Sequence, residues 1–487
     1  MPFSQRVAFF LLMLAVLTPC GAVCGQSMRP NVLFVLADDL GYGDLSCYGQ
    51  RLWETPHIDA AARKGVRFTQ HYAGSTVCAP SRAVLMTGLH TGHCPVRGNR
   101  NASPTSNWPL PSGAVTLAGK LQEVGYRTAL IGKWGLGDQH TTGDPLRQGF
   151  DHFFGYYHQN HAHNYWPEFL WRNGDRVPLS NTVPEPTPSG GGVATERGEY
   201  THDLFVDEAL RWIGEDAHGR PFMLLLTLTI PHANNEAGDE GQEVPDLGPY
   251  ADKPWPPAER ATAAMIARMD RDFGRLRARL AELGLAENTL VVFASDNGPH
   301  AEGGRDPRFS DSSGGLRGIK RDLYEGGIRV PAIACWPGVI GAGGVSESPS
   351  AFEDWLPTLA ELAGAEPLSG IDGVSLAPTL MGEGEQAPRE VLYWEFHEGV
   401  GARAVRVGDL KLIERGVATD DPEPVELYDL ARDPGENRDL ASERPDTVRR
   451  LAAVMRASRE PSADFSLPID EQSPTDGPSP AGNANAR

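Results

Sequence analysis

The amino-acid sequence predicts an α/β fold with a mostly parallel central sheet flanked by helices, followed by a small antiparallel sheet with one helix. Two observations predict this arrangement. From about residue 30 to residue 340, short apolar runs alternate with amphipathic helical patterns, which is typical of a parallel sheet covered on both faces. Near residue 387 the pattern changes to short strands joined by tight turns. The 487 residues are enough for one large α/β domain and a smaller appendage.

The strands of the large domain give the clearest pattern. Continuous apolar, β-branched runs predict buried parallel strands at residues 31–37, 127–131, 222–230 and 289–295. A weaker run at residues 328–335 contains Pro331, which removes one ladder donor. Between these runs the spacing of apolar residues predicts helices at residues 56–64, 81–87, 115–124, 203–213 and 259–283.

The domain boundaries follow from changes in this pattern. We expect the large domain at residues 28–386 and a small α+β unit at residues 387–460. The small unit should contain a helix at residues 447–458 and strands at residues 391–395, 404–407, 411–414 and 426–429. In residues 461–487 Pro, Ser, Gly, Asn and Asp dominate, which predicts a disordered tail.

The N-terminus resembles a secretory signal peptide, expected at residues 1–25. Arg6 precedes a short apolar stretch, and small residues follow it. The expected location is therefore secreted or periplasmic. Cys20 and Cys24 raise a lipoprotein alternative, but the residues before them fit a lipobox poorly. No later segment is long and apolar enough to predict a membrane span.

Charge and cysteine content limit the classes of partner. With 64 acidic and 44 basic residues the net charge is −20, so we expect no general attraction for nucleic acid. An anionic substrate would have to be captured by local cations or a metal. The last four of the six cysteines are not spaced like a zinc site. Cys47 and Cys94 could form a disulfide, a pairing that the sequence leaves open.

Polar side chains follow each of the four main strands. Ligands of open α/β sheets bind outside the carboxyl ends of the strands, so we expect these side chains to share one site. They are Asp38, Asp39, Lys133, His232, Asp296 and Asn297. Oxygen ligands without Cys or His favour Ca²⁺ or Mg²⁺ over zinc. Taken alone, Asp38 and Asp39 could equally be a helix N-cap.

The most specific string is Cys78-Ala79-Pro80-Ser81-Arg82, just before a predicted helix. Proline suits the first turn of a helix, so Cys78 should lie at its positive end, where an anion is stabilised. Arg82 lies one turn along and can reach the same place. A thiol in this setting should be activated. The alternative, a buried structural cysteine, fits a helix start beside arginine poorly.

This string, followed by Thr87-Gly88, resembles the signature of the type I sulfatases. The resemblance runs from about residue 29 through the small C-terminal unit. It implies the alkaline-phosphatase-like fold and hydrolysis of a sulfate monoester through a covalent sulfo-enzyme intermediate. It also implies that a formylglycine-generating enzyme oxidises Cys78 to formylglycine. One Ca²⁺ would be held by Asp38, Asp39, the modified Cys78, Asp296 and Asn297. The substrate would be a sulfated small molecule or glycan.

The same resemblance assigns roles to four further side chains. Arg82, Lys133 and Lys320 match residues around the sulfate, and His232 or Lys320 would be the general acid. Many sulfatases carry His two residues after the first of these lysines, but here the position is Gly135. A histidine-rich segment at residues 157–165 could supply the missing base or bind substrate. Its candidate substrate contacts are Gln159, His161 and His163, although these histidines could equally be loop residues that bind nothing.

Two alternatives remain open at this point. A phosphomonoesterase or phosphodiesterase of the same superfamily would tolerate the sheet and the metal pattern, but histidine ligands for a second metal are not evident. A secreted binding protein on an inactive scaffold would be expected to lack part of the signature, and only Gly135 favours it.

Overall fold

The computed structural model describes residues 29–419 and 423–468. Within this part of the chain the central sheet has ten strands in the order β13-β2-β12-β11-β1-β10-β6-β7-β8-β9. Its middle is parallel, as predicted, and consists of β11 (Thr289–Ser295), β1 (Asn31–Ala37), β10 (Phe222–Thr227), β6 (Arg127–Lys133) and β7 (His152–Tyr156). The carboxyl ends of these strands therefore meet along one edge of the sheet.

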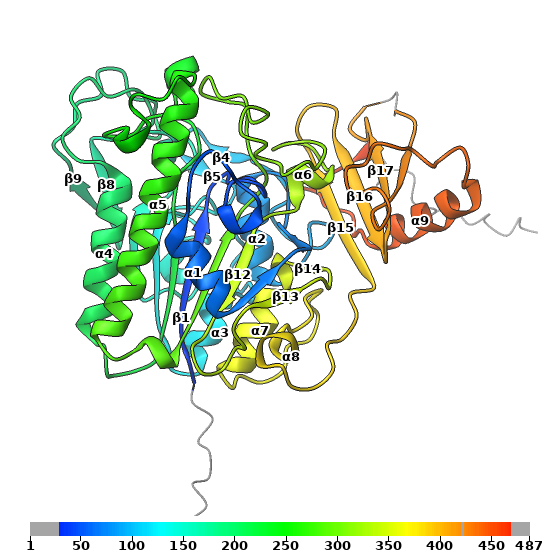
Figure 1. Ribbon diagram of the computed structural model, residues 1–487, viewed down its shortest axis with the longest axis horizontal. Coiled ribbons are helices and arrows are strands. Elements are labelled where there is room, and N and C mark those ends of the chain that lie inside the picture. Colours follow the sequence, from blue (N-terminus) through cyan, green and yellow to red (C-terminus); the bar gives the residue numbers. More distant parts are fainter. Residues whose placement is uncertain (1–28, 420–422, 469–487) are drawn as a thin grey trace, which may run out of the picture.

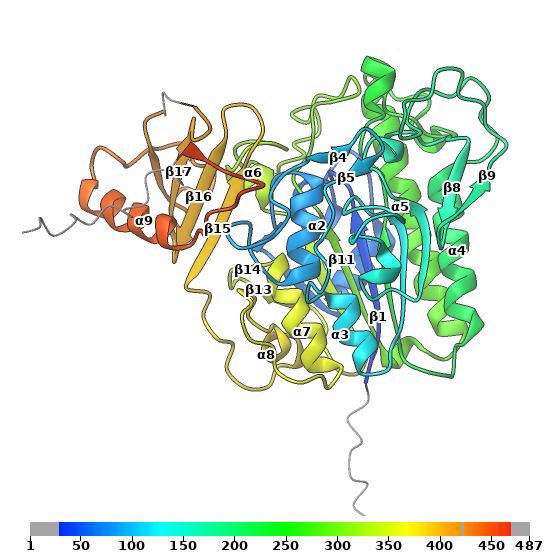
Figure 2. The ribbon, with the colours of Figure 1, turned by 180° about the vertical axis from the view of Figure 1, so that it is seen from behind.

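Helices cover both faces of the sheet, which explains the continuous apolar runs (Figures 1 and 2). Along β1, Leu33 and Val35 enter one core, whereas Val32 and Phe34 enter the other. The first core is closed by α1 (Pro56–Lys64), α4 (Thr201–Glu215) and α5 (Pro257–Glu282). The second is closed by α2 (Cys78–Thr87), α3 (Leu117–Glu123), α7 (Trp355–Leu362) and α8 (Ala377–Met381).

The edges of the sheet differ from the prediction. The fifth strand, β12 (Ala332–Cys335), begins only after Pro331, because proline offers no N–H to the ladder. It runs antiparallel to β11 and to β2 (Val66–Phe68). Helix α2 begins at Cys78 rather than at residue 81. The sequence did not indicate several short strands: β2, β3 (His71–Tyr72), β4 (Asn101–Ser103), β5 (Ser106–Asn107), β7, β8 (Phe169–Arg172), β9 (Asp175–Pro178), β13 (Gly344–Ser346) and β14 (Ser350–Ala351).

The small C-terminal unit is confirmed as an antiparallel sheet with one helix. Its strands are β15 (Val391–Phe396), β16 (Ala402–Val407), β17 (Leu410–Arg415) and β18 (Glu426–Asp429), and its helix is α9 (Pro445–Ala457). It packs beside α6 (Glu325–Ile328) of the large domain (Figure 1). The junction contains a buried ion cluster in which Lys411 Nζ lies 2.9 Å from both Glu325 Oε1 and Glu436 Oε1.

The ends of the chain and the thiols complete this account. The predicted signal peptide, residues 1–25, lies outside the described residues. The predicted tail was placed too early: Phe465 is only 4% exposed, because its ring packs against Trp108 of the large domain. The remainder of the tail, residues 469–487, is not described. The described cysteines Cys47, Cys78, Cys94 and Cys335 are all free, so the structure contains no Cys47–Cys94 disulfide.

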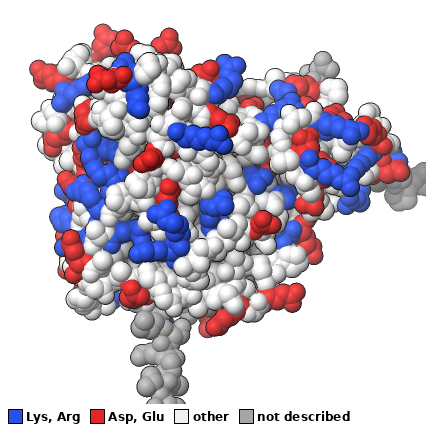
Figure 3. All heavy atoms as spheres, viewed as in Figure 1, with Lys and Arg blue, Asp and Glu red and all other residues white. Residues whose placement is uncertain are grey.

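The described surface is charged. On the face in Figure 3, acidic and basic side chains are interspersed. Among the described residues, no helix combines the length and the apolar character that crossing a membrane requires.

Candidate active site

The strand ends bring the predicted side chains together, as expected. Asp38 and Asp39 follow β1, Lys133 is the last residue of β6, and Asp296 follows β11. Since β10 and β11 flank β1 in parallel, their connecting loops leave the sheet side by side. His232 comes from the loop after β10. All of these side chains are buried.

Cys78 is the first residue of α2 and lies at the floor of the site, 3% exposed. Its Sγ donates to Asp38 Oδ1 at 3.3 Å and lies 3.3 Å from Lys133 Nζ. Burial and the Asp38 carboxylate raise the pKa of the thiol well above its ordinary value. This corrects the expectation of an activated thiol: the helix terminus and Lys133 do not offset desolvation and a neighbouring anion.

Three carboxylates and one amide converge beside Cys78. Arg82 binds Asp296 Oδ2 through Nε at 3.1 Å and Nη2 at 2.8 Å, and its Nη2 lies 3.5 Å from Asp38 Oδ2. Burial and the charge of Asp38 raise the pKa of Asp296 to about 7. Burial alone would raise the pKa of Asp38, but the positive charges of Lys133 and Arg82 lower it below its usual range.

The residues present fit a bound cation. Asn297 Nδ2 donates to Asp39 Oδ1 at 2.6 Å, while Asn297 Oδ1 is buried and has no hydrogen-bond partner among the described residues. An unpaired buried oxygen beside crowded carboxylates is costly unless a positive charge satisfies it. Asp38, Asp39, Cys78 and His232 also lie close enough to share one ion.

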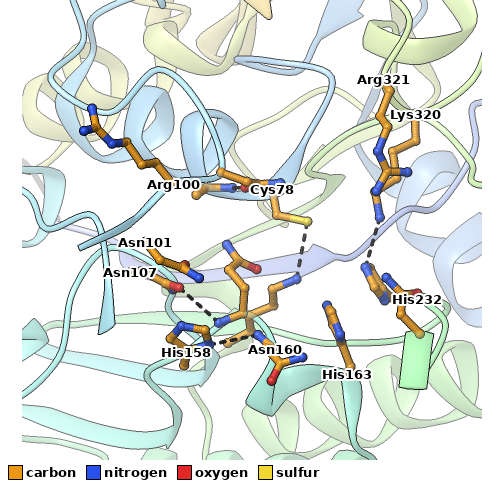
Figure 4. A pocket seen from close by; sticks show the side chains of 15 residues that line it. Cys78, Arg100, Asn101, Asn107, His158, Asn160, His163, His232, Lys320 and Arg321 are labelled. Carbon is orange, nitrogen blue, oxygen red and sulfur yellow. Dashed lines mark hydrogen bonds between the residues drawn. The ribbon is translucent and has the colours of Figure 1, made fainter. Parts of the chain in front are cut away.

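Two lysines and a histidine, Lys133, Lys320 and His232, line the pocket with Cys78, and Figure 4 shows Lys320 and His232 on the same side of it. Lys133 Nζ bonds Asp38 Oδ2 at 2.7 Å, and Lys320 Nζ bonds Asp39 Oδ2 at 2.8 Å. His232 Nδ1 lies 2.6 Å from the carbonyl oxygen of Ala233, so it carries the proton, and Nε2 accepts from Lys320 Nζ at 3.0 Å. Burial and the charge of Lys320 lower the pKa of His232 well below its ordinary value, so the ring is neutral.

The histidine-rich segment divides between the site and the core. Gln159 and His163 line the Cys78 pocket, and the His163 ring stacks on His232 with centroids 5.1 Å apart. His161 does not line this pocket: its ring is buried 4.9 Å from Tyr156 and 4.7 Å from Phe169, beside a neighbouring cavity. The structure therefore does not bring His161 to Cys78, in contrast to the expectation.

The pocket has a volume of about 210 Å³ and a polar wall that the sequence reasoning missed. This wall comes from the loop after α2 and from the residue after Lys320, and consists of Asn99, Arg100, Asn101, Asn107 and Arg321. The run of polar residues from Arg97 to Asn101, so soon after the nucleophile helix, is the signal that could have found it.

Comparisons with known proteins identify the family of the chain. The sulfatase family model matches residues 30–365, and a model described as N-sulphoglucosamine sulphohydrolase, C-terminal, matches residues 319–459. Arylsulfatase A of Homo sapiens is 36% identical over 453 residues, which cover 84% of this chain and 83% of that protein. Steryl-sulfatase of Mus musculus is 33% identical over 548 residues, covering 92% of this chain and 85% of that one.

The fold comparison gives the same result. A crystal structure of Ps i-CgsB in complex with k-i-k-neocarrahexaose superposes with a TM-score of 0.72 at 25% identity, covering 91% of this chain and 96% of that chain. The family match spans both the strand-end cluster and the Cys78 helix. The chain therefore belongs to the sulfatase family, as a type I sulfatase of the alkaline-phosphatase-like superfamily that hydrolyses sulfate esters.

Proposed function

We propose that the enzyme cleaves a sulfate monoester through a formylglycine made from Cys78, with one Ca²⁺ beside it. The position of Cys78 carries this proposal: it begins α2 and lies between the Asp38 carboxylate and the Lys133 ammonium. The raised pKa of the thiol argues against a thiolate nucleophile. As a hydrated formylglycine, residue 78 would supply one hydroxyl for attack on sulfur and a second for the later release of sulfate.

The cation would be held by Asp38, Asp39, Asp296 and Asn297. These side chains offer oxygen, the donor that Ca²⁺ prefers, and the unpaired Asn297 Oδ1 supports the assignment. The ion would supply positive charge to polarise a sulfate oxygen. Arg82 keeps two of the ligands in place, since its guanidinium contacts both Asp296 and Asp38.

Lys133 and Lys320 would bind sulfate oxygens, and their charges also balance the Asp38 and Asp39 carboxylates that they contact. The Lys320–His232 pair would protonate the leaving oxygen. In this pair the ammonium donates to a neutral imidazole, so Lys320 holds the proton and His232 aligns it. Gln159 and His163 would contact the substrate, because both line the pocket.

The substrate class is proposed from the pocket wall and one relative. Asn101 and Asn107 present amides, which suit the hydroxyl groups of a sugar. Ps i-CgsB was crystallised with the oligosaccharide k-i-k-neocarrahexaose, and we extend this binding class to a sulfated glycan here. Small aryl sulfates should serve as artificial substrates. Maturation would require a formylglycine-generating enzyme, and the enzyme would act in the periplasm or outside the cell.

Mass spectrometry of the peptide that contains residue 78, from protein made in its own host, tests the proposal. An aldehyde in place of the thiol is expected, and Cys78→Ala should abolish hydrolysis of 4-nitrophenyl sulfate without lowering the unfolding temperature. Cys94→Ala is the matched control, because Cys94 is also a buried thiol but lies outside the pocket. An unmodified thiol in active enzyme would overturn the mechanism. Faster turnover of 4-nitrophenyl phosphate would indicate a phosphoesterase.

A further inference from the structure

The pocket wall opposite Lys320 is a loop fastened to the nucleophile helix. Asn99, Arg100, Asn101 and Asn107 belong to this wall loop, residues 97–108, and all four line the pocket with Cys78. The Ala79 N–H donates to Asn99 Oδ1 at 3.0 Å, in the first turn of α2. The position of Arg100 is thereby linked to that of the nucleophile.

Arg100 differs from the other arginine at the pocket. Arg321 pairs with the carboxylates of Glu302 and Glu398, which neutralise much of its charge. Within residues 29–419 and 423–468, no carboxylate lies within ion-pair distance of Arg100. Its Nη1 donates only to a backbone carbonyl, that of Asp464. Arg100 and Arg321 lie on opposite sides of the pocket in Figure 4, and the Arg100 guanidinium extends outward, away from Cys78. The exposed Arg100 guanidinium therefore lies at the outer rim of the pocket.

Aromatic packing holds the Arg100 guanidinium in place. It stacks over Trp108, 4.2 Å from the ring centroid, and lies 5.8 Å from the Phe465 ring. Phe465 belongs to the C-terminal strap, residues 459–467, which returns from the small unit to the large domain. The Phe465 ring packs edge-on against Trp108 at 6.0 Å and against His397 at 5.7 Å. Through Phe465, the strap thus packs against both Arg100 and the Trp108 ring on which Arg100 stacks.

A second set of contacts joins the strap to the start of the wall loop. Arg97 Nη1 donates to the backbone carbonyl of Glu460 at 2.9 Å and to Glu395 Oε1 at 3.3 Å. Arg459 Nε donates to the other oxygen of Glu395 at 2.8 Å. Glu395 lies in β15, so the small unit, the strap and the wall loop share one buried carboxylate.

We propose that Arg100 forms a subsite at the outer rim of the pocket for a second anionic group of the substrate, a carboxylate or a second sulfate on a unit that neighbours the cleaved ester. A guanidinium binds either group through two parallel hydrogen bonds. Because stacking already orders the side chain, little rotamer entropy is lost on binding. The net charge of −20 repels an anionic glycan at long range, so the positive charge of Arg100 would provide local attraction at the pocket. The proposal rests on the proposed function, since it places the scissile sulfate at Cys78.

Three disaccharides that share one scissile sulfate test the subsite: one otherwise neutral, one with a uronic acid and one with a second sulfate. The wild-type enzyme should show a higher kcat/KM on one or both of the doubly anionic substrates, and the preferred one identifies the group bound. Arg100→Gln should reduce this preference about five- to tenfold, mainly through KM, and added salt should weaken it in the wild type. Arg449→Gln on α9 removes the same charge far from the pocket and should leave the preference unchanged.

The strap supplies an independent variant. Phe465→Ala should raise KM for the preferred doubly anionic substrate with little change in kcat, because Arg100 loses its support, and thermal unfolding verifies that the variant is folded. An equal preference in wild type and Arg100→Gln would overturn the subsite. If 4-nitrophenyl sulfate is hydrolysed in that case, the proposed function survives. If residue 78 is unmodified and no sulfate ester is cleaved, the proposed function fails instead.

Discussion

The side-chain amide of Gln159 fills the space beside Gly135: a Cβ on residue 135 would lie 2.3 Å from Gln159 Nε2. Gly135 also has a φ of +84°, which residues with a side chain rarely adopt. Gln159 Nε2 is buried and has no hydrogen-bond partner among the described residues. At the position where many sulfatases carry histidine, this chain therefore has a small residue that makes room for an amide donor from a neighbouring loop.

Gly135→Ala should lower both stability and activity. The new methyl group displaces Gln159 and strains the backbone, so the free energy of unfolding should fall by more than the roughly 1–2 kcal/mol that a left-handed alanine costs. Gly113→Ala is the matched control, since Gly113 has a φ of +77° but open space around its Cβ position. It should show the backbone cost alone and retain kcat/KM. Equal losses in the two variants would mean that the contact with Gln159 is unimportant. Chemical denaturation and steady-state kinetics provide both readouts.

Removing divalent cations with a chelator should lower the unfolding temperature as well as the activity, and Ca²⁺ should restore both. An ion present at a hundred times its dissociation constant stabilises the folded state by about 2.7 kcal/mol. Asp39→Asn should weaken this Ca²⁺-dependent shift, whereas Asp446→Asn, an exposed carboxylate on α9, should not. Scanning fluorimetry against Ca²⁺ concentration measures the effect. A shift that is the same in Asp39→Asn and wild type would contradict the ligand assignment.

Loss of the Lys320–His232 pair should affect poor leaving groups most. An alkoxide needs a proton as it departs, whereas 4-nitrophenolate leaves without one. In Lys320→Ala, kcat for an alkyl sulfate should fall about a hundredfold more than kcat for 4-nitrophenyl sulfate. His232→Ala should show a smaller difference in the same direction, because it aligns the donor. Equal losses on both substrates would assign the pair to sulfate binding alone.

Buried neutral histidines should make the fold sensitive to acid. Burial, with a smaller contribution from Arg389, lowers the pKa of His71 from 6.5 to about 3. Below pH 6.5 His71 is protonated in the unfolded chain but stays neutral in the folded protein. The free energy of unfolding therefore decreases as the pH is lowered from 6.5 to about 3. For this residue the loss at pH 5 is about 2 kcal/mol. His71→Gln should flatten the dependence measured by urea denaturation between pH 7 and pH 4, whereas the exposed His140→Gln should not. Parallel pH profiles for wild type and His71→Gln would contradict this assignment.

Sequence alone predicted the residues that are attached directly to regular structure. Asp38 and Lys133 lie at the ends of long apolar strands, and parallel topology brings such ends together. Arg100 and Asn107 were missed because they lie in a segment whose two strands, β4 and β5, are too short to show periodicity and whose wall is supported by the distant Phe465. Strand β7 was missed since Gly155 interrupts a short apolar run.

The sequence also could not tell which of the two histidines, His161 or His163, reaches the pocket. His161 and His163 lie in one 3-10 helix, where residues two apart face different sides. One ring therefore enters the core and the other reaches the pocket, a distinction that composition cannot make. For Cys78 the position at the start of a helix was predicted correctly, but its pKa was not. That pKa depends on burial and on Asp38, which follows a strand distant in the sequence.

The strap that supports Arg100 has a consequence for biosynthesis. A ribosome makes the chain from residue 1 onward, so the pocket wall lacks its support until residue 465 has emerged. Cys78 is by then long synthesised, and in the folded protein it is only 3% exposed. An enzyme that oxidises this buried thiol would thus have to act before the chain has folded around it, whereas the Arg100 wall is completed only after residue 465 has been made.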